Sequence, residues 1–433
     1  MSENAQLKRS LSLLDVVSLG VNGVVGQGIF FIPALAVSKV GPAALLALVI
    51  GAIICLMISL CFAEVGSRFQ GTGGAYLYAR EAFGDFVGFE VGWMTCLVAM
   101  TAWAALANGL VTKALAPLLS SQWQLELSPM MLTILPILLM STLAFINLRG
   151  AKWGATLSTI LSVLKLTPIA LVIFLGLPQL NSEAFTPFAP QGWSTLGEAT
   201  LMLLYAYVGF ETLVVPAGEM DNPKRSVPLA LIIVMSLVAM IYISVLAVSI
   251  ALVPEVAQSK SPVADASIVL LGPIGGTLIG YGILCSVLGT NAAAAMVSPR
   301  RIFAFAEGGH LPKILAFIHP KTGAPSYAII TLLLGSSLIS LTGSFEDLAV
   351  MSVVARFCQY IPTCIAALAL RRRGPAPFTL PGGALIPVLT TCACLTLLSF
   401  SDTKKLLFGL CALAVGALIY GLRSIDFSRF HSS

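Results

Sequence analysis

Three glycines, a glutamine and a proline interrupt the first long apolar segment of the chain. The stretch Gly23–Phe30 reads GVVGQGIF, and Pro33 follows it closely. A glycine inside a helix costs about 1 kcal/mol relative to alanine, and a proline unsettles the turn before it. The segment is therefore expected to break at mid-length and to leave backbone groups without helical partners. Such groups can bind a ligand, although small residues also let helices pack closely.

A second apolar segment is interrupted in the same way. Residues 203–228 read LLYAYVGFETLVVPAGEMDNPKRSVP, with Gly209 at the centre, Glu211 two residues later and Pro216 beyond. A carboxylate within an apolar segment is costly in a membrane and normally faces the interior of a helix bundle. Interrupted segments at matching places in two halves of a chain are the best sequence pointer to a midplane transport site.

The two interruptions together suit a zwitterion. Free N–H groups at Gln27 and Gly28, at the start of a half-helix, present a positive dipole end to a carboxylate. Free carbonyls before the first break, and from Tyr205 to Val208 in the second, can accept hydrogen bonds from an ammonium group. One ligand that carries both groups on a single carbon is an α-amino acid.

Two basic residues lie at membrane depth, Lys165 and Arg356. Lys165 could snorkel to an interface, but it lies 11 residues past Gly154, roughly 16 Å into the bilayer at about 1.5 Å per residue. We favour an ammonium held against the broken backbone of the first segment. Arg356 is expected to pair with an acidic neighbour. Glu211 and Glu90 are further candidates for handling a proton, or are simply hydrogen-bonded in the bundle.

The elements that carry these residues belong to a membrane protein. Of 433 residues, 58% are hydrophobic and only 10% charged, whereas a soluble domain is nearer 25% charged. The apolar residues fall in long runs such as Ala43–Cys61 and Leu229–Val253, each long enough to cross a bilayer. The fold class is therefore an all-α polytopic membrane protein.

We count twelve apolar spans, of which the third and the eighth look longer than a bilayer requires. The expected spans begin near Leu11, Pro42, Glu81, Pro129, Gly154, Thr195, Val227, Asp265, Ser326, Phe345, Gly383 and Lys404. With the N-terminus inside, most of the 24 Lys and Arg residues, Arg300 and Arg301 among them, fall on the cytoplasmic side. Both termini are therefore expected in the cytoplasm of a cell (plasma or inner) membrane.

Several functional classes are disfavoured by the residues. The three histidines lie outside the spans, and no catalytic or metal-binding pattern is present, so we expect no enzyme, metal or cofactor. A channel would need repeated polar rings along a pore, and none is seen. The net charge of +5 reflects membrane topology, so no nucleic-acid partner is expected.

In five sequence blocks the chain resembles the amino acid–polyamine–organocation (APC) superfamily of transporters. The family motif G-x-I-G-x-G-I-F stands here as GVVGQGIF, and the resemblance extends over nearly the whole chain. Four further blocks carry it: AEVGSRFQGTGGAYLYAREAFGDFVGFEVGW, GFET…GEMDNPKRSVP, SPRRIFAFAEGGHLPKILAFIHPKTGAP and LAVMSVVARFCQYIPTCIAALALRRR.

The resemblance implies a leucine-transporter-type fold with a 5+5 inverted repeat, helices 1 and 6 unwound, and two C-terminal helices. The repeats would cover residues 1–180 and 181–372, with helices 11 and 12 and the tail in 373–433. It implies that the unwound part of span one holds the substrate carboxylate, that carbonyls of Val24, Tyr205 and Val208 hold the amine, and that Tyr205 caps the substrate. The expected substrate-binding set is Val24, Gly26, Gln27, Gly28, Tyr205, Tyr207, Val208 and Gly209.

Gln27 departs from the family, in which Ser or Thr commonly stands between the two glycines. Lys165 stands where several APC transporters have a lysine and sodium-coupled relatives bind an ion, which implies sodium-independent transport. Proton symport and exchange both remain open, with Lys165 and Glu211 as the expected coupling residues.

The side chains that would select a substrate favour a neutral amino acid. Span three offers Thr101, Trp103 and Asn108, and span six offers Tyr207 and Phe210. Span eight offers the run Asn291–Ala295. None of these sets contains an acidic cluster. The alternative is a cationic amino acid or a polyamine, with Glu211 as its counter-ion. A transporter-like receptor that binds without transporting is an alternative of another class. The expected partners are an amino acid, protons and the lipid bilayer, and the oligomeric state stays open.

Overall fold

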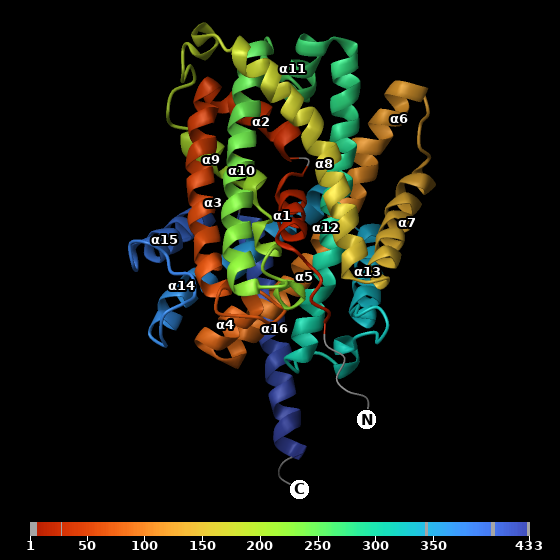
Figure 1. The fold of residues 1–433 in the computed structure, drawn as a ribbon, viewed down its shortest axis with the longest axis vertical. Coiled ribbons are helices and arrows are strands. Elements are labelled where there is room, and N and C mark those ends of the chain that lie inside the picture. Colours follow the sequence, from red (N-terminus) through yellow and green to blue (C-terminus); the bar gives the residue numbers. More distant parts are fainter. Residues whose placement is uncertain (1–6, 27, 343–344, 400–402, 431–433) are drawn as a thin grey trace.

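The computed structural model describes residues 7–26, 28–342, 345–399 and 403–430, and this part of the chain is helical, with connecting loops (Figure 1). Six of its helical segments are long and apolar enough to cross a membrane. Apolar side chains such as Leu138, Phe174 and Leu338 are exposed on the outside of the bundle. Lipid can cover such a surface, so the prediction of a polytopic helical membrane protein is confirmed.

The helices lie close to the expected spans. In the first half of the chain they are α1 (Leu13–Val24), α2 (Gly28–Val40), α3 (Ala44–Gly66), α4 (Ala75–Phe83), α5 (Asp85–Gly109), α6 (Ala116–Trp123), α7 (Pro129–Leu148), α8 (Ala151–Gly176) and α9 (Leu196–Leu204). In the second half they are α10 (Pro223–Leu252), α11 (Pro262–Leu271), α12 (Pro273–Glu307), α13 (Ser326–Thr342), α14 (Phe345–Arg371), α15 (Leu385–Ser399) and α16 (Thr403–Phe430).

The third and eighth expected spans, which look longer than a bilayer requires, each contain an irregularity. α5 continues through a π-helical turn, Leu110–Leu115, into α6. The eighth expected span, which was predicted to begin near Asp265, is two helices, because α11 ends at Leu271 and α12 starts at Pro273, with Gly272 between them. Gly272 has φ +66°, a left-handed conformation that ends a helix readily in glycine.

Helices from distant parts of the sequence pack together around α1. α12 packs along α8, α10 along α3, and α14 along α5, while α1 contacts α8, α10 and α12 (Figure 1). Several of the described helices carry an internal proline, which a membrane helix tolerates when its neighbours satisfy the freed carbonyl; these include Pro136, Pro168, Pro228, Pro299 and Pro362. The core of the bundle is thus built around a short, interrupted helix.

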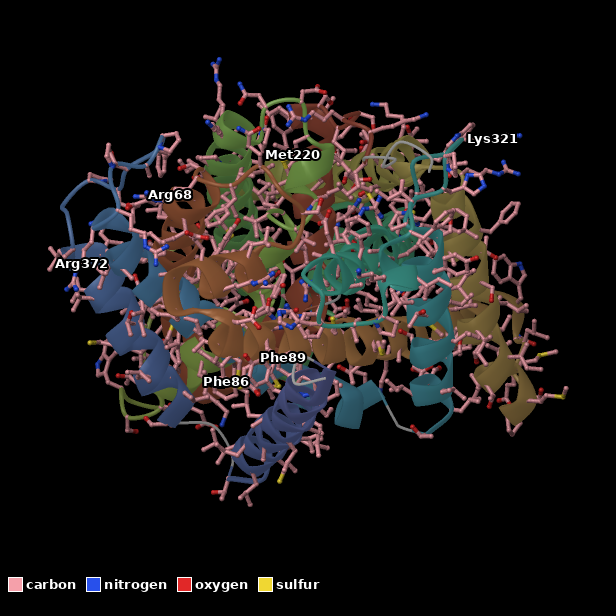
Figure 2. All side chains as sticks on the ribbon, turned by 90° about the horizontal axis from the view of Figure 1, so that it is seen from below. Arg68, Phe86, Phe89, Met220, Lys321 and Arg372 are labelled. Atoms are coloured by element: carbon pink, nitrogen blue, oxygen red, sulfur yellow. The ribbon has the colours of Figure 1, made fainter. Side chains whose placement is uncertain are left out.

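The two described chain ends lie at the same end of the bundle, the lower end in Figure 1. Figure 2 views this end from below, with Arg68 and Arg372 on one side and Lys321 on the other. Here Leu11 pairs with Met220 in an isolated parallel bridge, so the chain before α1 is fastened to the chain before α10.

Two ion pairs with fully or almost fully buried carboxylates lie toward the same end. Arg300 of α12 donates to both carboxylate oxygens of Glu219, at 2.6 and 2.9 Å, and both side chains are almost fully buried. Arg371 of α14 holds Glu64 of α3 in a similar fork, and Glu64 also accepts a hydrogen bond from the N–H of Leu380. Each carboxylate is therefore satisfied by donors from another part of the chain, as burial requires.

Candidate functional site

The first helix is broken where the glycines stand. α1 ends at Val24 and α2 begins at Gly28, and the N–H of Gly26 donates to the carbonyl of Val24 at 2.9 Å in a tight turn. A Cβ atom at Gly26 would lie 3.3 Å from Oγ1 of Thr290 in α12, so a larger residue would require the Thr290 side chain to shift by a few tenths of an ångström. Gln27 lies outside the described residues.

The second break also occurs where it is expected. α9 ends at Leu204, a short 3-10 turn covers Tyr205–Tyr207, and a second turn starts at Phe210. Between them Gly209 has φ +123°, which L-residues with a side chain rarely adopt. The chain therefore has no α-helix between Leu204 and Pro223.

The two breaks meet backbone to backbone. A Cβ atom at Gly209 would overlap the carbonyl oxygen of Gly23, and a Cβ at Gly23 would lie 3.2 Å from the carbonyl oxygen of Gly209. Gly23 therefore permits the close packing that small residues allow, and the expected break follows it, because α1 ends one residue later. Gly23, which the sequence did not single out as a site residue, is one of the two glycines that bring the breaks together.

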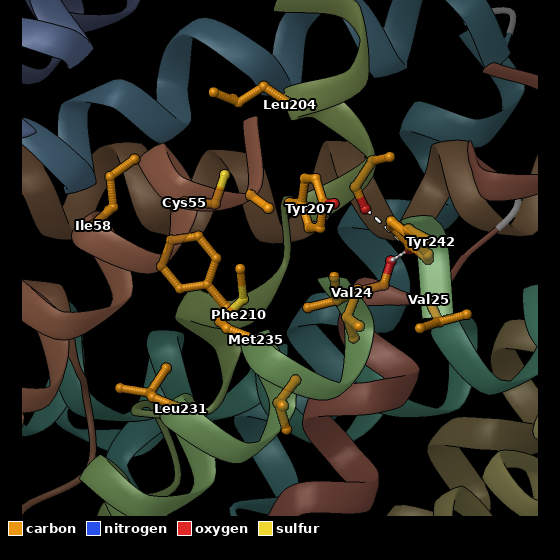
Figure 3. Close-up of a cluster of buried hydrophobic side chains, with 14 of the residues drawn as sticks. Val24, Val25, Cys55, Ile58, Leu204, Tyr207, Phe210, Leu231, Met235 and Tyr242 are labelled. Carbon is orange, nitrogen blue, oxygen red and sulfur yellow. Dashed lines mark hydrogen bonds between the residues drawn. The ribbon is translucent and has the colours of Figure 1, made fainter. Parts of the chain in front are cut away.

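Tyr242 of α10 joins the breaks through its hydroxyl group. The hydroxyl lies 3.1 Å from the carbonyl oxygen of Val24 and 3.1 Å from that of Ala206 (Figure 3). Its ring packs against Tyr207, with 5.2 Å between the ring centroids. A hydroxyl has one proton, so it donates to one of the two carbonyls at a time. The sequence does hold a signal for this residue, because a tyrosine buried within an apolar span needs a hydrogen-bond partner.

Lys165 reaches the end of α1, as predicted. Its side chain is 0% exposed, and Nζ donates to the carbonyl oxygens of Val21 at 3.2 Å and Val25 at 2.6 Å. The hydroxyl of Ser286 in α12 also donates to Val25, at 3.0 Å. Among the described residues no carboxylate lies within 4.0 Å of this ammonium. Its charge is stabilised by carbonyl oxygens at the C-terminal, negative end of a helix dipole.

Glu211 faces the bundle interior and is 1% exposed. Its carboxylate forms an ion pair with Arg356 of α14, accepts from the hydroxyl of Tyr360 at 2.9 Å, and accepts from the N–H of Gly209 at 3.0 Å. The prediction that Arg356 pairs with an acidic neighbour is confirmed. Glu90 stands apart from this cluster, in α5 against Gly416 of α16, with no hydrogen-bond partner for either carboxylate oxygen in the described structure.

The predicted selectivity residues divide into two groups. Tyr207 and Phe210 are buried beside the breaks (Figure 3). Thr101 donates to the carbonyl of Leu97 within its own helix, whereas Asn108 bonds Ser340 and so joins α5 to α13. Asn291 likewise donates to Leu106 of α5.

The structure therefore brings most of the expected site into one region. Gly209, Val24 and Tyr207 meet at the paired breaks, Glu211 follows two residues later, and Lys165 binds the last turn of α1. Gly26, Gly28 and Val208 lie in the same interrupted stretches. Gln27 and the side chain of Tyr205 are outside the described part of the structure.

A family profile described as amino acid permease matches residues 11–410 of the chain. The chain belongs to the amino acid permease family. This is a family of transporters, not of enzymes, and the permease is a multi-pass membrane protein.

Individual relatives of the permease differ in what their names say they carry. It is 29% identical to the serine/threonine exchanger SteT of Bacillus subtilis (strain 168) over 98% of both chains. It is 26% identical to the branched-chain amino acid permease BcaP of the same organism, over 100% of this chain and 95% of that one. It is 30% identical to human cationic amino acid transporter 4 over 89% of this chain, but spans only 63% of the human protein's length.

Proposed function

We propose that the permease is a secondary active amino acid transporter whose substrate binds where the two breaks meet. The observation that carries this proposal is the contact between Gly23 and Gly209, beside an ammonium group buried at the end of α1. Irregular backbone at membrane depth is tolerated where it lines a cavity or is buried in protein. Two such stretches side by side supply both donors and acceptors for one small zwitterion.

The binding geometry follows from the direction of the half-helices. α2 starts at Gly28, so the N–H groups of Gln27 and Gly28 would hold the substrate carboxylate at a positive helix end. Carbonyls of Val24, Tyr205 and Val208 would hold the ammonium group. The carbonyl of Val24 already accepts from Gly26 and lies within reach of Tyr242. When an ammonium group takes its place there, the Tyr242 hydroxyl can donate to Ala206 instead.

The Lys165 ammonium supplies the positive charge that a sodium ion would otherwise supply, so transport does not require sodium. Its ammonium bridges the carbonyls of Val21 and Val25, where a bound metal cation would otherwise neutralise the helix end. A lysine that keeps its proton is compatible with exchange of amino acids, and one that releases it is compatible with proton symport. Glu211 is the second group that would respond to a proton.

We propose a neutral amino acid as the substrate. Glu211, the carboxylate nearest the second break, is already neutralised by Arg356 and held by Tyr360, so it is not free to serve as counter-ion for a second amine. Tyr207 and Phe210 add apolar and aromatic surface beside the breaks. The alternative, a cationic amino acid or polyamine, is supported by the name of the human relative.

The proposed topology has twelve spans, with α1 and α2 forming the first and α9 with its following turns the sixth. Spans one to five and six to ten would form the inverted repeats, residues 1–180 and 181–372, followed by helices 11 and 12 in 373–433. The end of the bundle that carries both described chain ends would face the cytoplasm, because basic side chains such as Arg68, Lys321 and Arg372 lie at this end (Figure 2).

Uptake into proteoliposomes tests the proposal. Each of the 20 amino acids, and putrescine as a diamine, is offered with sodium or with potassium outside, with and without an inward proton gradient. We expect uptake of neutral amino acids that is unchanged when sodium is replaced. Uptake of arginine or putrescine alone would establish the alternative substrate class. Ligand-induced stabilisation without any uptake or counterflow would identify a receptor instead of a transporter.

A further inference from the structure

The carboxyl group of Glu90 lies where α5 contacts α16, away from the paired breaks. A Cβ atom at Gly416 of α16 would lie 2.7 Å from Oε2 and 3.1 Å from Oε1 of Glu90, so the carboxyl group lies directly against the backbone of α16. About one turn further along both helices, Nε1 of Trp93 donates to the carbonyl oxygen of Ala412 at 2.9 Å. The carboxyl group is therefore part of the contact between the two helices.

No donor reaches this carboxyl group within the described part of the chain. Both oxygens of Glu90 are buried, and neither has a hydrogen-bond partner or a cation beside it. Asp85, at the start of the same helix, is a clear contrast, because Nε of Arg80 lies 3.0 Å from its carboxylate. An unpaired carboxylate in apolar surroundings is costly, whereas the protonated carboxyl group carries no charge to desolvate.

The side chains around the contact are apolar or aromatic. Phe86 and Phe89 of α5 pack against Tyr420 of α16, with 5.2 and 5.1 Å between the ring centroids (Figure 2). The hydroxyl group of Tyr420 donates to Asp85 at 3.4 Å. The titratable side chains that the described parts of α14 and α16 bring to this region are Cys358, Cys411 and Tyr420. None of the three is a cation that could hold a carboxylate.

We propose that Glu90 is a proton-binding site in the contact between α5 and α16. Its carboxyl group carries a proton while the helices are packed, and the proton leaves when α16 separates from α5 at Gly416. The proton is bound in the packed form, so its stabilising contribution is complete in acid and is lost as the pH rises. α16 lies at the outside of the bundle, with Leu410 and Leu418 exposed, so it can move without displacing the paired breaks.

A hydrophobic carbodiimide tests for the bound proton directly. N,N′-dicyclohexylcarbodiimide adds to a protonated carboxyl group in apolar surroundings and rearranges to a stable N-acylurea, with no leaving group. The purified permease is treated at about pH 6 and about pH 9, and mass spectrometry of its peptides locates the adduct. We expect modification of Glu90 at the lower pH and about fivefold less at the higher. The carboxylates held by arginine should stay unmodified, namely Glu64, Glu211 and Glu219.

Glu90→Gln imitates the protonated group and gives a structural readout. Hydrogen–deuterium exchange of residues 406–422 in α16 is compared between wild type and variant at the same pH, so that the intrinsic pH dependence of exchange cancels. We expect equal exchange at about pH 6 and exchange several-fold faster in wild type at about pH 9, because only wild type then carries a charge against α16. Glu126→Gln, at an exposed glutamate, is the matched control and should behave as wild type.

Arg423→Gln tests the nearest basic residue along α16. Arg423 is seven residues beyond Gly416, about 10 Å by helical rise, and its side chain lies outside the described residues. We expect the variant to be modified at Glu90 as wild type is. Modification that appears only in Arg423→Gln would show that Glu90 is charged and paired, and would overturn the proposal.

Two further results would overturn the site. They are the absence of an adduct at Glu90 at about pH 6, and exchange in α16 that does not differ between wild type and Glu90→Gln at about pH 9. Neither measurement requires a substrate. Failure of the transport proposal, seen as no uptake of any amino acid, would leave both results unchanged.

Discussion

The carbonyl oxygen of Gly23 in α1 occupies the space that a Cβ atom at Gly209 would take. Gly209 lies between two 3-10 turns with φ +123°, so the second break is both left-handed and pressed against the first. Each break therefore depends on the other for its shape. Under the proposed function, a ligand that binds to one break would change its contact with the second, which would link binding to relative movement of the two interrupted helices.

Replacing Gly209 with alanine should abolish transport. The left-handed backbone costs a residue with a side chain roughly 1–3 kcal/mol, and the overlap with Gly23 adds to it. We expect an initial uptake rate at least tenfold lower and a lower Tm in detergent. Gly197→Ala is the control, because Gly197 is exposed in α9 with no other group within 4 Å of a Cβ atom. Wild-type uptake by Gly209→Ala would mean that the close contact is not needed.

Lys165→Met should abolish amino acid transport and should destabilise the protein less than Gly209→Ala does. The carbonyls of Val21 and Val25 lose the ammonium but keep hydrogen bonds from Val25 N–H and Ser286. We expect a loss of stability of about 1–2 kcal/mol and loss of amino acid uptake and of ligand-induced stabilisation. Lys152→Met is matched in chemistry but alters an exposed lysine paired with Asp15, and should transport normally. Sodium-independent uptake by Lys165→Met would exclude the proposed role of the ammonium.

The sequence was sufficient for the parts of the site that depend on local signals. Glycine and proline inside an apolar run predict a break, and a lone charge inside such a run predicts a buried partner, so the breaks, the Lys165 contact and the Arg356 pair were all anticipated. The composition likewise predicted a polytopic helical protein. These inferences need only the nearest turns of the chain and the cost of a polar group in hydrocarbon.

Features that depend on distant partners were not anticipated. Arg300 and Arg301 were assigned to the cytoplasmic side, and their burial within α12, which continues to Glu307, was not predicted. The partner of Arg300 is Glu219, 81 residues away, and no local pattern predicts that pairing. The shared contact of Tyr242 with Val24 and Ala206 also requires three segments to be in place at once.

Tyr242→Phe should loosen the link between the breaks without unfolding the protein. Only the hydroxyl is lost, so the packing against Tyr207 remains and the cost should be about 0.5–1.5 kcal/mol. We expect KM for the amino acid to rise several-fold, because neither the carbonyl of Val24 nor that of Ala206 can then accept a hydrogen bond from α10 at this position. Tyr281→Phe, at an exposed tyrosine of α12, should leave KM unchanged. An unchanged KM in Tyr242→Phe would limit the hydroxyl to a structural role.

The buried pair between Arg300 and Glu219 should be needed for folding, more than for binding. Arg300→Leu leaves a buried carboxylate without its partner, and we expect a loss of about 3–5 kcal/mol, seen as little monodisperse protein on size exclusion and a much lower Tm. The double variant Arg300→Leu/Glu219→Leu removes both charges and should recover much of that loss. Lys39→Ala breaks the exposed pair with Glu198 and should cost at most about 1 kcal/mol. A double variant as unstable as Arg300→Leu would show that the Arg300–Glu219 pair does more than neutralise charge. The loss of stability would then come from the hydrogen bonds that join α12 to the segment after the second break.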